Sequence, residues 1–148
     1  MEDSNWIYML ESMQSIRYFS RVMIQRATKE YQMPAEHLEL LSRLAVSNEK
    51  MTPMTLSKLM KVNKTIISRI IDKLNNIGYL IKTKDENDKR SYFVSITELG
   101  EEQLKNIYKH YLGPIYELRR KLGEKDFSQL MACIEEANVK MNDHVEGI

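Results

Sequence analysis

Polar and basic side chains in the middle of the chain have the types and spacing that nucleic-acid recognition uses. A run that begins at Asn63 predicts a helix whose buried face carries Ile67, Ile70, Ile71 and Leu74. At about 100° per residue, the opposite face carries Thr65, Ser68, Arg69 and Asp72, flanked by Ile66 and Lys73. Arginine can bind both acceptors of guanine, hydroxyls can bind bases or phosphates, and isoleucine can contact a thymine methyl group. This face therefore suits a major groove, while the alternative interpretation is an ordinary solvated helix surface.

A second group of charged residues lies at the tip of a predicted hairpin. Two β-branched and aromatic runs, 79–84 and 91–97, flank six polar residues, 85–90. Arg90 would stand far from the body of the domain, where a narrow minor groove concentrates negative potential. Asp88, two residues earlier, could orient that guanidinium through a paired hydrogen bond. The alternative here is a solvated surface ion pair, which contributes little.

Charge supports placing both groups in one nucleic-acid-binding region. Residues 54–92 hold nine basic and four acidic residues, a net charge of +5, whereas the rest of the chain holds 13 basic and 17 acidic residues, a net charge of −4. A basic centre between acidic ends is typical of a local polyanion site. The residues expected to contact DNA are Asn63, Lys64, Thr65, Ile66, Ser68, Arg69, Lys73, Lys84, Asp88, Lys89 and Arg90.

The flanking sequence predicts the elements that position these residues. Apolar residues in steps of three and four predict a long amphipathic helix from Trp6 to Tyr31, and a second helix follows Pro34. Thr55 is expected to cap a third helix and Asn63 a fourth, with a left-handed stop at Gly78. After the hairpin, a helical run from Glu98 contains Pro114, which predicts a kink near Tyr111. Gly123 should end that run, and Asp126 should cap a last helix.

Composition excludes several classes of protein. The 148 residues include 43% apolar and 29% charged residues, with only 5 Gly and 3 Pro, which describes an ordered globular chain. No apolar run approaches the roughly 18 residues that a membrane span needs, and the polar start predicts no signal peptide. The single cysteine, Cys133, indicates a reducing compartment, so a cytoplasmic location is expected. The sequence has no Gly-rich phosphate loop and no recognisable nucleophile–base grouping, so it does not suggest an enzyme or a cofactor.

These motifs together resemble the MarR family of bacterial transcription regulators. Asp88-Lys89-Arg90, Val94, Ile96-Thr97 and Gly100 are similar to the family's D-x-R…V-x-L-T-x-x-G pattern, with Ile96 in place of leucine. Residues 63–74 resemble the family's recognition helix, and residues 78–81 its entry to the wing, after which Lys82 stands where arginine is frequent. The resemblance implies a winged-helix homodimer on double-stranded DNA with a pseudo-palindromic operator. It also implies a small ligand or an oxidant that releases the DNA.

The sequence offers three weak candidates for such sensing. Cys133 is a candidate redox switch, but it lies beside Ile134 and Leu130 on a predicted apolar face, where a cysteine is commonly buried and inert. Glu36-His37 is similar to part of the site in zinc-responsive relatives, but the positions of the further ligands hold Asn106, Ile107 and Tyr111, so no metal is expected. A small aromatic or phenolic effector is the third option, without an assignable residue.

The expected fold is mainly α with a small β-hairpin wing, an α+β winged helix-turn-helix. Residues 34–100 form the predicted DNA-binding region, and residues 1–33 and 101–148 form the predicted dimerisation helices. The expected function is a sequence-specific DNA-binding transcription regulator, a repressor acting as a homodimer. The alternative is a winged-helix protein-interaction module that does not bind DNA.

Overall fold

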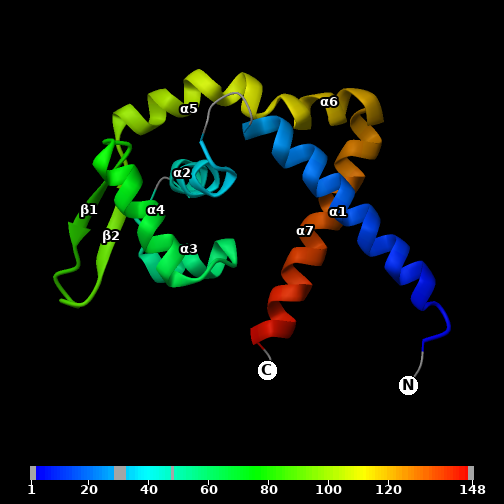
Figure 1. Cartoon of the computed structure of the whole chain (residues 1–148), viewed down its shortest axis with the longest axis horizontal. Coiled ribbons are helices and arrows are strands. Elements are labelled where there is room, and N and C mark those ends of the chain that lie inside the picture. Colours follow the sequence, from blue (N-terminus) through cyan, green and yellow to red (C-terminus); the bar gives the residue numbers. More distant parts are fainter. Residues whose placement is uncertain (1–2, 29–32, 48, 147–148) are drawn as a thin grey trace. The chain divides into compact units, whose positions relative to one another are not determined.

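A computed structural model of the chain describes residues 3–28, 33–47 and 49–146. It contains two compact units, residues 1–111 and residues 112–148. The first unit holds five helices and a hairpin in the described residues, in the order α1 (Trp6–Thr28), α2 (Ala35–Ser47), α3 (Pro53–Met60), α4 (Lys64–Asn76), β1 (Leu80–Lys84), β2 (Tyr92–Ile96) and α5 (Glu98–Tyr111). The second unit holds α6 (Gly113–Leu122) and α7 (Glu124–Glu146), which contact each other. Figure 1 labels these elements along the chain.

The core of the first unit is apolar and comes from the elements around α4. The predicted face of α4 is buried at all four positions, which confirms the periodicity. Side chains of α2, α3 and both strands complete the cluster, which comprises Leu40, Leu41, Leu44, Leu56, Met60, Ile67, Ile70, Ile71, Leu74, Leu80 and Val94. The core therefore fixes α4 by one face and leaves the opposite face open.

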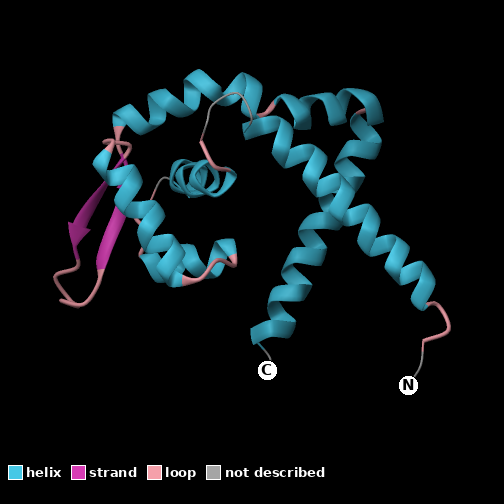
Figure 2. Ribbon diagram, viewed as in Figure 1, coloured by secondary structure: helices cyan, strands magenta, loops and turns pink. Residues whose placement is uncertain are grey.

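The two strands pair antiparallel beside α4, as Figure 2 shows. Leu80 lies opposite Ile96 and Lys84 opposite Tyr92, so the six residues 85–90 form the connecting tip, as predicted. One pairing was not predicted: Met51 exchanges backbone hydrogen bonds with Val94, at 2.9 and 2.8 Å between nitrogen and oxygen. This bridge ties the segment before α3 to the middle of the wing.

Two predicted helix caps are wrong. Thr52 rather than Thr55 caps α3: its hydroxyl accepts a hydrogen bond from the Thr55 amide at 3.1 Å, and Pro53 takes the first helical position. The last helix begins at Glu124, so Asp126 lies within its first turn, where an acidic side chain favours the helix dipole.

The expected interruption near Pro114 is present. The helical run divides into α5, which ends at Tyr111, and α6, in which Pro114 lies in the first turn. Proline is tolerated there because the first turn does not need its missing amide donor. Gly123 ends α6 as predicted, with φ of 85°.

The first helix is apolar on positions that its own unit does not cover. Trp6, Met9, Met13 and Ile16 keep 59%, 57%, 53% and 64% of their surface exposed, although α1 contacts α2 and α5. The predicted end of this helix at Tyr31 lies outside the described residues. None of the helices in the described part of the chain combines the length and the apolar character that crossing a bilayer requires.

Candidate nucleic-acid interface

The helix-turn-helix is held by short local hydrogen bonds. Lys61 ends α3 in the left-handed conformation with φ of 55°, and the Ser57 hydroxyl donates to the Val62 carbonyl at 2.5 Å. Asn63 then caps α4, as predicted, because its Oδ1 accepts from the Ile66 amide at 2.9 Å. This tight turn fixes where α4 begins and which way its first residues point.

The open face of α4 carries the predicted contact residues. Lys64, Thr65, Arg69 and Lys73 are exposed, and Ile66 keeps 37% of its surface exposed. Ser68 is half-buried, because it borders the core face. Among the described residues, no ion pair or hydrogen bond engages the Arg69 guanidinium, so it is free to bind an external acceptor.

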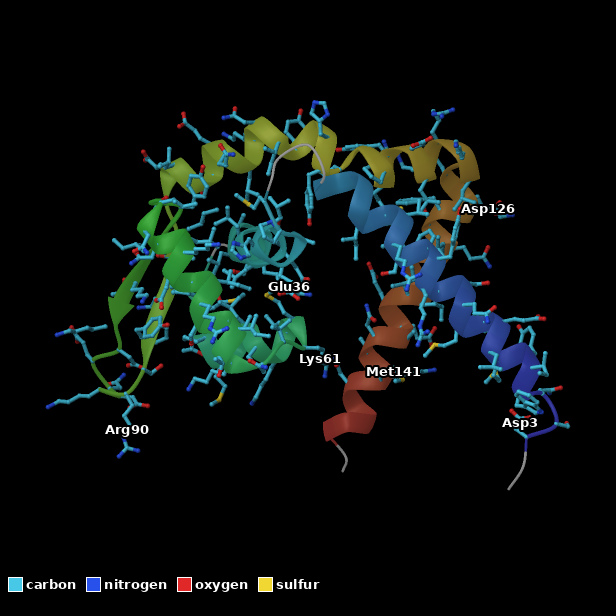
Figure 3. The ribbon with its side chains drawn as sticks, viewed as in Figure 1. Asp3, Glu36, Lys61, Arg90, Asp126 and Met141 are labelled. Atoms are coloured by element: carbon cyan, nitrogen blue, oxygen red, sulfur yellow. The ribbon has the colours of Figure 1, made fainter. Side chains whose placement is uncertain are left out.

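The hairpin presents its charged tip away from the domain. Lys84, Lys89 and Arg90 are all exposed, and Figure 3 shows the side chain of Arg90 directed outward from the end of the hairpin. The turn is closed by two aspartates: Asp85 Oδ1 accepts from the Asn87 amide and Asp88 Oδ1 accepts from the Arg90 amide, each at 3.0 Å. The wing therefore holds Arg90 through its backbone.

The role expected for Asp88 changes accordingly. The predicted hydrogen bond to the Arg90 guanidinium is not present in the structure, where the carboxylate accepts from the Arg90 backbone amide instead. The physical reason is local, because an aspartate readily accepts from the amide two residues later in a turn. Asp88 thus orients Arg90 by fixing the turn.

The base of the wing is fastened by Thr97. Its hydroxyl donates to the Gly78 carbonyl at 2.6 Å and accepts from the Gly100 amide at 3.1 Å. Gly78 has φ of 85°, as the predicted left-handed stop requires. A Cβ at Gly100 would lie 2.2 Å from the Tyr79 carbonyl oxygen, so this position needs glycine for close backbone approach. The wing is thereby joined to both α4 and α5.

Two further cations lie in this region that were not among the predicted contact residues. Lys82 on β1 forms an ion pair with Asp72 on α4, and the Lys50 ammonium lies 4.6 Å from the centre of the Phe93 ring. Neither pair has a sequence signal, because the partners lie far apart along the chain.

A hollow of about 670 Å³ flanks the open face of α4. It lies between the start of α2 and α4, and its lining includes His37, Ile66, Arg69 and Lys73. Burial lowers the pKa of His37, and the nearby Lys73 charge lowers it further. Within the described residues, no group of three or more metal-ligating side chains is assembled, at Glu36-His37 or elsewhere.

The remaining sensing candidate, Cys133, is exposed on α7 rather than buried. The expectation of burial is therefore wrong for the single chain.

Comparison with known proteins identifies the architecture. Residues 33–100 match a family described as a winged helix DNA-binding domain. Residues 33–100 therefore form a winged-helix domain, and the fold of the chain is shared with solved MarR structures. The fold of MarR from E. coli, as a cysteine-to-serine mutant complexed with operator DNA, matches 93% of this chain and 99% of that one with a TM-score of 0.70 and 18% identity. The fold of a MarR transcriptional regulator from Methanosarcina mazei Go1 matches 95% of this chain and 99% of that one, with a TM-score of 0.72 and 20% identity.

A sequence relative agrees with this assignment. An uncharacterized HTH-type transcriptional regulator of Bacillus subtilis (strain 168), YkoM, is 28% identical over 119 residues, which cover 77% of this chain and 73% of the relative. The fold class and the family resemblance predicted from the sequence are both confirmed.

Proposed function

We propose that this chain is a sequence-specific DNA-binding transcription regulator that represses by binding a pseudo-palindromic operator as a homodimer. The observation that carries the proposal is the joint exposure of Arg69 on α4 and Arg90 on the wing, within one basic winged-helix domain. The fold shared with a MarR protein complexed with operator DNA supports it. The comparisons give no support to the alternative, a winged-helix module that binds only protein.

In this proposal the two exposed groups read different grooves. The open face of α4 enters the major groove, where Arg69 binds base acceptors and Ile66 contacts a thymine methyl group. The wing lies along the sugar–phosphate backbone of the DNA and places Arg90 in the adjacent minor groove. The remaining contacts position the domain on bases and phosphates through Asn63, Lys64, Thr65, Ser68, Lys73, Lys84, Asp88 and Lys89.

The homodimer accounts for the apolar surface of the helical ends. The exposed Trp6, Met9, Met13 and Ile16 recur at steps of three and four along α1, and apolar side chains gathered on one exposed helix face mark an interaction surface. On α7, Val139 and Met141 are 59% and 65% exposed. We assign residues 1–33 and 101–148 to dimerisation and residues 34–100 to DNA binding. Two domains related by a two-fold axis would then bind half-sites about 34 Å apart.

The proposal includes release by a small aromatic or phenolic effector. It rests on the family resemblance alone, and no residue is assigned to that ligand.

Selection from a pool of randomised DNA duplexes with the full-length protein tests the proposed function. We expect enrichment of a two-fold symmetric sequence whose halves are about 10 base pairs apart. Binding that shows a salt dependence but no preferred sequence would overturn the proposal.

A further inference from the structure

An acidic side chain lies on the helix that is proposed to read DNA. Asp72 is on the open side of α4, and its side chain is 59% exposed. An isolated carboxylate at that position would repel phosphates. It also lies three residues after Arg69, a spacing at which an aspartate and an arginine on one helix can pair. Asp72 could therefore both weaken DNA binding and occupy the guanidinium needed for base recognition.

The structure gives Asp72 a different partner. Lys82 on β1 donates from Nζ to Asp72 Oδ1 at 2.5 Å, and the same ammonium lies 5.1 Å from the centre of the Tyr92 ring on β2. The hydrogen bond to Asp72 raises the pKa of Lys82, so the ammonium stays charged. One cation thus joins α4 to both strands of the wing.

The position of Lys82 on its strand explains why it reaches α4. Side chains alternate between the two faces of a strand, so Lys82 shares the face of Leu80, which is buried against the core. Its neighbour on the opposite face, Ile81, is 53% exposed and points away from that core. The position of Lys82 along the strand therefore places its side chain on the face from which it can reach Asp72.

We propose that Lys82 is a positioning residue for DNA recognition: by engaging Asp72 it keeps Arg69 free to bind a base and fixes the wing against α4. The inference rests on the proposed function. A surface ion pair of this exposure adds little to stability, so its effect is expected in DNA binding rather than in folding. Lys82 acts through Asp72 and does not itself need to touch DNA.

A double-mutant cycle with full-length protein tests this role, with Kd measured at fixed salt on a duplex selected by the wild type. Lys82→Met should weaken binding about tenfold, because Asp72 is then left to repel phosphate and to pair with Arg69. In the Asp72→Asn background, Lys82→Met should weaken binding by less than about twofold, because no carboxylate remains to repel phosphate or to pair with Arg69. Lys82→Arg, which can still reach Asp72, should bind like the wild type.

Lys84→Met provides the matched control. Lys84 lies on the same strand and the same face as Lys82 but has no ion-pair partner among the described residues. Because Lys84 is a proposed phosphate contact, Lys84→Met should weaken DNA binding by the same factor whether or not Asp72 is replaced by asparagine. Lys82→Met should also flatten the base preference at the position that Arg69→Ala flattens, and Lys84→Met should not. Lys82→Gln replaces Lys82→Met if the latter lowers the melting temperature.

Equal losses for Lys82→Met in both backgrounds would overturn the positioning role and make Lys82 a plain phosphate contact. That result leaves the proposed function intact as long as the wild type selects a sequence. A wild-type protein without sequence preference would overturn the proposed function and this inference with it.

Discussion

Arg69 and Lys73 lie one turn apart on the open side of α4 and are expected to do different things. Arg69 has a free planar guanidinium that can bind two acceptors of one guanine, whereas an ammonium such as that of Lys73 is a point charge suited to phosphate. Arg69→Ala should reduce the free energy of binding to the preferred sequence by about 1–3 kcal/mol and relax the base preference at one position. Lys73→Ala should weaken all sequences alike and lower the salt slope by about one. Binding curves on matched and mismatched duplexes distinguish them, and an identical uniform loss for both would show that the reading face is misassigned.

Asp88 gives a prediction whose sign is informative. Asp88→Ala removes a negative charge near DNA, which by simple electrostatics would tighten binding. Because its carboxylate holds the Arg90 amide at 3.0 Å, we expect weaker binding instead. Asp88→Asn keeps an oxygen acceptor for that amide and should bind nearly as the wild type does.

Glu86→Ala is the control for the Asp88 variants. Glu86 lies at the same tip and has no hydrogen-bond partner among the described residues, so its removal should tighten binding slightly. Anisotropy titrations at one salt concentration measure all three variants. Tighter binding by Asp88→Ala would leave Arg90 as a generic phosphate contact.

Residue types alone predicted the open face of α4 but not all of its surroundings. Helical periodicity fixes which positions are buried, so the three core isoleucines and one leucine of α4 and the outward Arg69 followed from the sequence. The bond from Asp88 to a backbone amide and the pair between Asp72 and Lys82 did not. Both depend on where a side chain turns after the backbone has folded, and in the second pair ten residues separate the partners.

At the scale of elements, the junction of the wing with α5 leaves no room for a side chain at Gly100. The Tyr79 carbonyl oxygen would lie 2.2 Å from a Cβ at Gly100. Neither atom can move aside by a side-chain rotation, because the oxygen belongs to the backbone and the Cβ is bonded directly to it. Gly100→Ala should therefore destabilise the fold by about 1–3 kcal/mol, through displacement of the first strand from α5. Chemical denaturation measures the loss.

Gly113→Ala is the matched control for that junction. A Cβ at Gly113 would meet nothing within 4 Å apart from its two chain neighbours, and Gly113 is not among the glycines with positive φ. The substitution should change the free energy of unfolding much less than Gly100→Ala does. Equal effects of the two substitutions would contradict the account of the wing's attachment.

Element boundaries were predictable where proline and glycine mark them. Gly78 and Gly123 follow the ends of helices and Pro114 lies in the first turn of one, because each has a backbone requirement that the sequence displays. The caps were less predictable, since Thr52 and Thr55 both flank Pro53 and only the first is placed to accept from an amide. The Met51 bridge to Val94 was missed because a single paired residue has no periodicity.

At the scale of the whole molecule, the exposed apolar side chains of α1 are proposed to pack against a second copy of the chain. Met9→Glu together with Ile16→Glu should shift the protein from dimer to monomer at micromolar concentration, because both side chains are more than half exposed in the single chain and are proposed to be buried in the dimer. Gln14→Glu on the same helix is the control and should leave the dimer intact. Sedimentation velocity distinguishes the two states, and a wild-type chain that sediments as a well-folded monomer would contradict the proposed assembly.

The central claim is that the open face of α4 and the tip of the wing form one DNA-binding surface. Lysine acetylation of the full-length protein, with and without a selected duplex, tests it most directly because lysines lie both on and away from that surface. Mass spectrometry should show that DNA protects Lys64, Lys73, Lys84 and Lys89, whereas Lys105 and Lys125, which are also exposed, react equally in both states. Protection of Lys105 and Lys125 with unchanged reactivity of the first four would place DNA elsewhere and contradict the account.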